Sequence, residues 1–243
     1  MTAPALPAGW GTSGSGNGIL WVTSTTTPDT APNCAFVDDQ DGISDKVLVI
    51  PDISIISASA QLSFRNNFNT AFFDGVYWDG GVLEVSSPNI NGGDFTDITD
   101  PAVRGSFVSG GYTGEITDKR ENPLAGRMAW TGDSGGYIET VVNLGPNVNG
   151  QTIKLRFRFG TDEVAGAPGW RIDTMTMVGE GACASPTPSP TPTPSGALWY
   201  NGDWDFVGYH ANEQNTSSSN SMVYDDFSVE GSGGTVTAVF SNN

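Results

Sequence analysis

Hydrophobic and polar residues alternate with a period of two along most of residues 1–183. The segment Gln151 to Phe159 is the clearest case, because Ile, Leu and Phe at every second position alternate with Lys and Arg. Alternation of this kind places the apolar side chains on one face of a half-buried strand. The other segments with a strand pattern are Ile19 to Thr23, Lys46 to Ile56, Ala60 to Phe68, Gly81 to Ser86, Gly136 to Leu144 and Trp170 to Val178.

Seven or eight antiparallel strands of this length predict an all-β fold, a jelly-roll-like antiparallel β-sandwich. No window of twelve residues has a helical stripe, and the 32 glycines suit short strands joined by many turns. In the last of these strands, the alternation predicts that Trp170, Ile172, Thr174 and Thr176 share one face. Four tryptophans lie within alternating patterns and are predicted to be core residues: Trp10, Trp21, Trp130 and Trp170.

The clearest domain boundary is a Pro/Ser/Thr linker over residues 184–196, which reads ASPTPSPTPTPSG. Alternating Pro favours polyproline-II geometry and buries nothing, so the linker acts as a semi-rigid spacer. It separates a predicted sandwich over residues 1–183 from a short β-rich segment over residues 197–243. Three strand-like pieces in this segment predict either a truncated second module or a hairpin docked on the first domain.

Net charge narrows the classes of partner. The chain has 10 Lys+Arg against 27 Asp+Glu, which gives a formal net charge of −17. Such a surface repels nucleic acid and anionic lipid, so we expect neither nucleic-acid binding nor membrane insertion. Cations, basic protein patches and, with aromatic side chains present, neutral sugars remain as ligands. No transmembrane run is present, and no signal-peptide pattern follows Met1.

The two cysteines, Cys34 and Cys183, bracket most of the first segment. We predict a disulfide between them, because the linker is typical of secreted proteins and disulfides persist outside the cell. The alternative is a pair of buried, reduced thiols.

One motif suggests catalysis, and its chemistry is incomplete. Residues 132–136 spell GDSGG, the string around the nucleophile of trypsin-like proteases, but that serine needs a histidine base. The only histidine is His210, beyond the linker and on the wrong side of the serine. Gly, Asp and Ser also form turns, which explains the same letters. Pairs of acids could in principle hydrolyse a glycoside, but nothing marks one pair. No catalytic residue is therefore predicted, and we expect no enzymatic activity.

Acidic residues gather near predicted turns, at residues 38–41, at Asp74 and Asp79, at residues 94–100 and at residues 162–163 with Asp173. Loop aspartates and main-chain carbonyls are the ligands that calcium prefers, so we predict at least one structural calcium. Asp39, Asp74, Asp79 and Asp173 are the candidate ligands. The alternative is a solvated acidic surface that aids solubility.

Three aromatic residues lie among Gly, Asn and Asp, which is a typical setting for side chains that stack on sugars. They are Tyr77, Trp78 and Trp204. They are candidates for contact with a carbohydrate or another ligand. Aromatic residues that pack beneath turns are the alternative.

Several short motifs occur in the order found in one known family. They are Leu6 to Trp10, Ser44 to Pro51, Ala60 to Phe64, Asp79 to Val85, Gly150 to Phe157 and Gly169 to Asp173. Together they resemble the choice-of-anchor J domains of bacterial secreted proteins, relatives of the cleaved-adhesin domains of gingipains and of the MAM domain group. The resemblance implies a jelly-roll sandwich, a secreted or surface location, and roles in adhesion or beside hydrolases. It also implies calcium, with Asp79 and Asp173 as ligands or site-shaping acids.

The chain departs from this family at its start. Relatives usually carry an additional strand with a Phe-Glu or Phe-Asp pair, whereas only residues 1–5 precede the Leu-Pro-Ala-Gly-Trp motif here. A missing strand leaves an exposed sheet edge, through which the protein could associate with itself.

The sequence therefore predicts a non-catalytic extracellular adhesion or structural binding module, stabilised by calcium, with an extracellular protein or a glycan as its ligand. The alternatives are a carbohydrate-binding module and an accessory domain of a secreted hydrolase.

Overall fold

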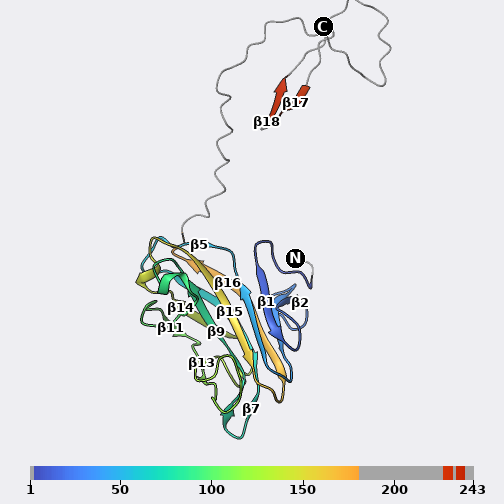
Figure 1. Cartoon of the computed structure of the whole chain (residues 1–243), viewed down its shortest axis with the longest axis vertical. Helices are drawn as coiled ribbons and strands as arrows, with labels where there is room; N and C mark the ends of the chain where they lie inside the picture. Colours follow the sequence, from blue (N-terminus) through green and yellow to red (C-terminus); the bar gives the residue numbers. More distant parts are fainter. Residues whose placement is uncertain (1–2, 181–226, 232–233, 239–243) are drawn as a thin grey trace, which may run out of the picture. The chain divides into compact units, whose positions relative to one another are not determined.

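The computed structural model describes residues 3–180, 227–231 and 234–238, and the chain divides into two compact units, Met1–Cys183 and Ala184–Asn243. The first unit consists of two six-stranded antiparallel sheets packed face to face (Figure 1). The β-sandwich predicted from the alternation is therefore confirmed.

The first sheet has the strand order β1-β4-β15-β9-β10, and β5 also pairs with β15. Its strands are β1 (Gly11–Gly16), β4 (Ser44–Val49), β5 (Ile53–Ser54), β9 (Gly80–Ser86), β10 (Thr96–Asp97) and β15 (Thr152–Thr161). The second sheet has the order β11-β14-β6-β16-β3-β2. Its strands are β2 (Val22–Ser24), β3 (Cys34–Asp39), β6 (Gln61–Asn69), β11 (Ser106–Ser109), β14 (Ile138–Asn143) and β16 (Ala167–Val178).

Shorter elements complete the described residues. Two hairpins extend from the sandwich, and two 3-10 turns lie in its loops. They are β7 (Phe72–Phe73) with β8 (Val76–Tyr77), β12 (Gly114–Glu115) with β13 (Met128–Ala129), η1 (Asn91–Gly93) and η2 (Pro146–Val148). The second unit contains one antiparallel hairpin, β17 (Phe227–Gly231) with β18 (Gly234–Ala238). The strand-like piece predicted at residues 197–200 lies outside the described residues.

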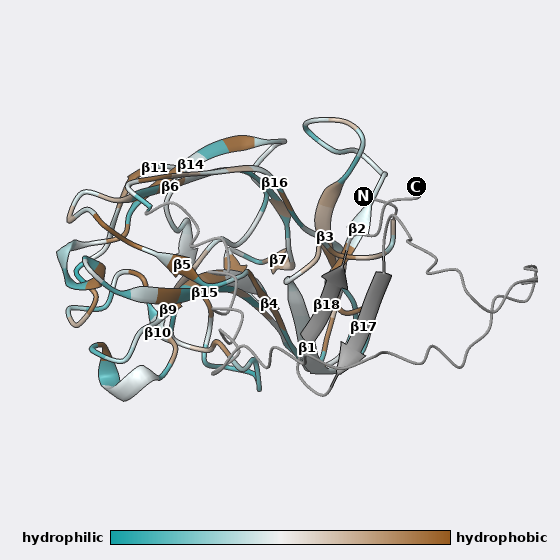
Figure 2. Ribbon diagram, turned by 90° about the horizontal axis from the view of Figure 1, so that it is seen from above, coloured by the Kyte–Doolittle hydropathy of each residue, from teal (hydrophilic) through white to brown (hydrophobic). Residues whose placement is uncertain are grey.

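The core lies between the two sheets, which appear as separate layers in Figure 2. From β15, the alternating Ile153, Leu155, Phe157 and Phe159 are all fully buried, as their spacing predicts. Trp170 packs edge-on against Phe157 at 5.8 Å between ring centroids. Three of the four tryptophans predicted for the core, Trp21, Trp130 and Trp170, are at most 1% exposed, whereas Trp10 is only partly buried.

The face predicted for the end of β16 is wrong. Trp170 and Ile172 are buried, but the pairing of β16 with β6 shifts register between Asp173 and Thr176, where Thr174 has φ +45°. A β-bulge inserts an additional residue, so the side chains beyond it exchange faces. Thr174 and Thr176 are exposed, and Met175 and Met177 pack against the core instead.

Two strand boundaries also differ from the prediction. The segment Lys46 to Ile56 is not one strand, because it breaks at Pro51 into β4 and β5. Proline has no N–H to donate to a sheet ladder. Asp-Gly is a dipeptide typical of turns, but Asp79-Gly80 leads directly into β9, and the hairpin turn lies at the other Asp-Gly pair, Asp74-Gly75.

β1 is an edge strand of the first sheet, and five of its six residues are exposed. Its sequence GTSGSG contains neither charge nor proline, the usual protections of an open edge. Within the part of the chain that the structure describes, no helix is long and apolar enough to span a bilayer.

Self-association through β1 stays a prediction, and charge placed on the strand tests it. If two copies pair along β1, replacing both Ser13 and Ser15 by Lys is expected to abolish the dimer, because lysines on an edge oppose pairing. Sedimentation velocity measures the outcome. As a control, Ser106→Lys with Ser109→Lys places the same charges on the edge strand β11. Equal behaviour of the two double variants, or a wild-type protein that is monomeric at high concentration, contradicts the prediction.

Candidate functional site

The hairpin β7–β8 lies at one end of the sandwich (Figure 1) and carries the aromatic residues Phe72, Phe73 and Tyr77. Phe72 is 52% and Phe73 is 67% exposed, and the ring of Phe72 lies 4.7 Å from that of Tyr77. The two-residue turn consists of Asp74 (φ +52°) and Gly75 (φ +75°). Positive φ at both positions is the requirement of a type I′ hairpin turn, and Asp-Gly is among the sequences that meet it. The Asp74-Gly75 turn thus fixes a short hairpin in which Phe72 and Phe73 remain exposed to solvent.

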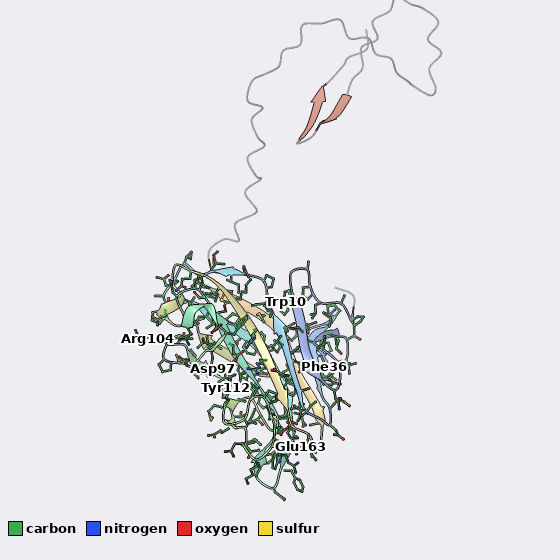
Figure 3. All side chains as sticks on the ribbon, viewed as in Figure 1. Trp10, Phe36, Asp97, Arg104, Tyr112 and Glu163 are labelled. Atoms are coloured by element: carbon green, nitrogen blue, oxygen red, sulfur yellow. The ribbon has the colours of Figure 1, made fainter. Side chains whose placement is uncertain are left out.

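A pocket of about 430 Å³ lies beside this hairpin. Its walls come from the β6–β7 connection, from Trp78, from Arg120 and from the β15–β16 loop. The lining residues are Asn69, Thr70, Ala71, Phe72, Phe73, Trp78, Arg120, Asp162, Val164, Ala165, Gly166 and Ala167. Figure 3 places Glu163, from the same loop, at this end of the molecule. The volume falls within the range of about 300–1,000 Å³ that is usual for ligand pockets.

Three aspartates are each about 1% exposed in this region: Asp162 lines the pocket, and Asp39 and Asp79 accept hydrogen bonds from main-chain groups of lining residues. The Ala71 N–H donates to Oδ2 of Asp39 at 3.0 Å. The Asp162 N–H donates to Oδ1 of Asp79 at 2.6 Å, and the Asn122 amide donates to the same oxygen at 3.2 Å. The acids therefore hold the two walls of the pocket in place from below.

The carboxyl groups of Asp39 and Asp79 lie against each other in this buried site. Burial raises the pKa of Asp39 to about 7. Burial, followed by the charge of Asp39, raises the pKa of Asp79 to about 9. Oδ1 of Asp39 has no hydrogen-bond partner. Two buried carboxylates in contact need a shared proton or a cation, because like charges at short range cannot both remain ionised.

Of the four acids predicted as metal ligands, the structure brings together two, Asp39 and Asp79. Asp74 lies on the exposed turn of the β7–β8 hairpin. Asp173 lies in β16, where its carboxylate accepts hydrogen bonds from the N–H groups of Thr30 and Thr174. No group of three or more His, Cys, Asp and Glu side chains converges as a metal site anywhere in the described ranges.

Arg120 lies over the pocket. Its guanidinium carbon is 5.2 Å from the ring centroid of Trp78, and its Nε is 3.6 Å from Oδ2 of Asp162. Its Nη1 donates a hydrogen bond to Oε1 of Glu163. Oδ2 of Asp162 accepts no hydrogen bond, whereas its Oδ1 accepts the Val164 N–H at 2.7 Å.

The protease-like string forms a turn, as the alternative explanation predicts. The Ser134 hydroxyl accepts the Phe68 N–H at 3.0 Å and lies 2.8 Å from the Gly136 carbonyl. Asp133 caps the same turn by accepting the Gly135 N–H. The serine is thus held by main-chain groups. His210 lies outside the described residues.

A second pocket, of about 240 Å³, contains Cys34 and Asp173. Cys34 is buried, and burial raises the pKa of its thiol. Cys183 and Trp204 lie outside the described residues, so the disulfide and the contact through Trp204 stay predictions.

Sequence reasoning named Tyr77, Trp78, Asp39 and Asp79 in this region, and it missed the phenylalanines and Arg120. The missed signal was the pair Phe72-Phe73 immediately before Asp-Gly. A two-residue hairpin turn cannot bury both neighbouring aromatic residues.

Comparison with known proteins finds similar structures but no similar sequence family. No family model matches the chain, and no curated protein matches it. Membership of the choice-of-anchor J family therefore stays a prediction.

Solved structures share the β-sandwich architecture at low similarity. One is a carbohydrate-binding module of the β-sandwich superfamily, studied for promiscuous specificity (11% identity, TM-score 0.40, 71% of this chain and 58% of that chain). Another is the K1 cleaved adhesin domain of Lys-gingipain from Porphyromonas gingivalis W83 (16% identity, TM-score 0.43, 72% of this chain and 94% of that chain). A third is TmCBM61 in complex with β-1,4-galactotriose (12% identity, TM-score 0.40, 71% of this chain and 90% of that chain). The chain thus spans just over half the length of the first, and similarity at this level assigns no function.

Proposed function

We propose that this chain is a non-catalytic extracellular adhesion or structural binding module that binds its ligand in the pocket beside the β7–β8 hairpin. The observation that carries the proposal is the exposure of Phe72 and Phe73 on the rim of that pocket. Large aromatic side chains left in solvent around a concave site are typical anchors of a binding surface, because a ligand can bury them.

The extracellular location rests on the sequence. The Pro/Ser/Thr spacer over residues 184–196 and the resemblance to bacterial surface domains both favour it. An accessory role beside a secreted hydrolase is compatible with the same pocket, because such domains also act by binding.

Calcium stabilisation is part of the proposal and is supported by the paired acids below the pocket. Asp39 and Asp79 supply two buried carboxylates, and one oxygen has no hydrogen-bond partner. A hard cation with a preference for oxygen fits this donor set, and calcium also accepts main-chain carbonyls. Bound there, it would neutralise the two charges and join β3, which carries Asp39, to the segment before β9, which carries Asp79.

Removal of one anchor tests the ligand site. Phe73→Ala is expected to weaken binding about fivefold or more, because truncation of an aromatic anchor costs about 1 kcal/mol or more. Binding to a glycan array and to immobilised collagen and fibronectin measures the effect. Phe73 is 67% exposed, so the melting temperature should stay unchanged.

A matched control is Val108→Ala, which truncates another exposed apolar side chain, 59% exposed, on β11. The proposal is contradicted if the protein binds none of these probes, or if the Phe73 and Val108 variants bind equally.

A carbohydrate ligand is the second candidate. It is favoured by the combination of aromatic side chains with Asp162, a lining residue whose buried Oδ2 accepts no hydrogen bond.

A further inference from the structure

Three aromatic residues line the pocket. Phe72 and Phe73 are exposed, and the half-buried Trp78 adds an indole ring. Aromatic rings bury a large area at a low cost in side-chain entropy. Their faces suit a ligand with a flat face of C–H groups.

One polar group in the pocket lacks a hydrogen-bond donor. Asp162 lines the pocket and is about 1% exposed, and its Oδ2 is a buried atom that accepts no hydrogen bond and has Arg120 as an ion-pair partner at 3.6 Å. A buried acceptor without a partner costs free energy, so a ligand that donates a hydrogen bond there gains the difference. The ligand must therefore carry a donor such as a hydroxyl.

A donor lies beside this acceptor. Nε of Arg120 is 3.6 Å from Oδ2 of Asp162, which is beyond hydrogen-bond distance. A guanidinium has five N–H donors, and the bond to Glu163 uses only part of them. A hydroxyl group both donates and accepts, so two hydroxyls on adjacent carbons can bridge Asp162 and Arg120.

The charges around the pocket disfavour ionised ligands of either sign. Asp162 and Glu163 lie at the site, Asp133 is bonded to the lining residue Asn69, and the whole chain carries −17. An anionic sugar would be repelled. A cationic ligand meets Arg120, which already lies between the indole and the carboxylates.

We infer that the pocket binds an uncharged sugar, with one face of the ring on the aromatic side chains and two neighbouring hydroxyls bridging Asp162 and Arg120. The inference rests on the proposed function, because it names the ligand class for that same pocket.

An array that contains four classes of probe tests the inference. The classes are oligosaccharides ending in glucose, galactose or mannose, oligosaccharides ending in uronic acids, oligosaccharides ending in amino sugars, and Arg/Lys-rich peptides. Saturable binding is expected only to uncharged sugars. Asp162→Asn should weaken it at least tenfold, because the amide keeps Oδ1 as acceptor for the Val164 N–H and replaces the acceptor Oδ2 by a donor.

Arg120→Gln provides a second variant, since its side chain is 36% exposed and its loss should not prevent folding. It should also weaken sugar binding at least tenfold. Arg65→Gln is the matched control, because Arg65 is 34% exposed and is paired with Asp29 outside the pocket. This variant should bind as the wild type does.

The outcomes separate the two levels of the proposal. Phe73-dependent binding of charged sugars or basic peptides, with uncharged sugars silent, overturns the ligand class and leaves the binding pocket standing. Uncharged-sugar binding that is unaffected by both Asp162→Asn and Arg120→Gln overturns the bridging arrangement. The absence of Phe73-dependent binding to any probe overturns the proposed function itself.

Discussion

The calcium-free protein is expected to lose stability as the pH rises from about 4 towards 9. In the folded state, the pKa of Asp39 is raised to about 7 and that of Asp79 to about 9, against a usual value of 3.8. The folded state therefore binds more protons than the unfolded state across this range. Stability falls with rising pH wherever that holds, so the contribution is fully present below pH 3.8 and is lost by about pH 9.

The expected loss is large. One pH unit of difference in pKa between the folded and unfolded states corresponds to about 1.4 kcal/mol, so the pair accounts for several kcal/mol. Calcium bound at this pair, as proposed, would replace the proton between the carboxylates and flatten the dependence. At a concentration one hundred times its dissociation constant, it should add about 2.7 kcal/mol. Urea unfolding at a series of pH values, with calcium and with chelator, measures both effects.

Variants locate the effect. Asp79→Asn removes one titrating group and keeps an oxygen to accept the Asp162 N–H, so it should flatten the pH dependence and abolish the calcium effect. Asp173→Asn is the control, because that carboxylate lies in another pocket. If the stability depends on pH in the same way with and without calcium, the Asp39–Asp79 pair binds a proton and no calcium. Equal effects of the two substitutions, or no pH dependence, contradict the role given to the pair.

Trp170→Ala is expected to destabilise the sandwich by about 3–5 kcal/mol, the usual cost of deleting a buried tryptophan. The ring is fully buried, and its centroid lies 5.1 Å from that of Trp21 and 5.6 Å from that of Trp130. It also lies directly against the β9 backbone, since a Cβ added to Gly81 would be 2.2 Å from it. Its Nε1 donates to Oδ1 of the buried Asn66 at 2.7 Å, and the substitution leaves that oxygen without this donor.

For a domain of this size, the loss corresponds to a fall of about 6–20 °C in melting temperature. Thermal unfolding followed by circular dichroism measures it. Val178→Ala, at the exposed end of the same strand, should change stability by less than about 0.5 kcal/mol. A Trp170→Ala protein that melts within a degree or two of the control contradicts the central role of this ring.

Alternation alone predicted much of the sandwich, because a strand with one buried face has to repeat apolar residues with a period of two. β6 follows this rule from end to end and β15 follows it as far as Phe159, as their alternating burial shows. The strands that the sequence missed have other patterns. β1 is an exposed edge of Gly, Ser and Thr, and β3 ends in Asp38-Asp39, which indicated a loop.

The sequence by itself determined the all-β sandwich, and it predicted a boundary at the Pro/Ser/Thr spacer and a group of candidate acids and aromatic residues. Only the tertiary structure decided which acids meet. Asp162 donates to Asp79 across 83 positions of sequence, and Asp39 reaches Ala71 across 32. Periodicity reports which face of a strand is buried, but the pairing of strands distant in sequence decides which side chains share a pocket. The same is true of the bulge in β16, where one inserted residue moved Thr174 and Thr176 away from the core.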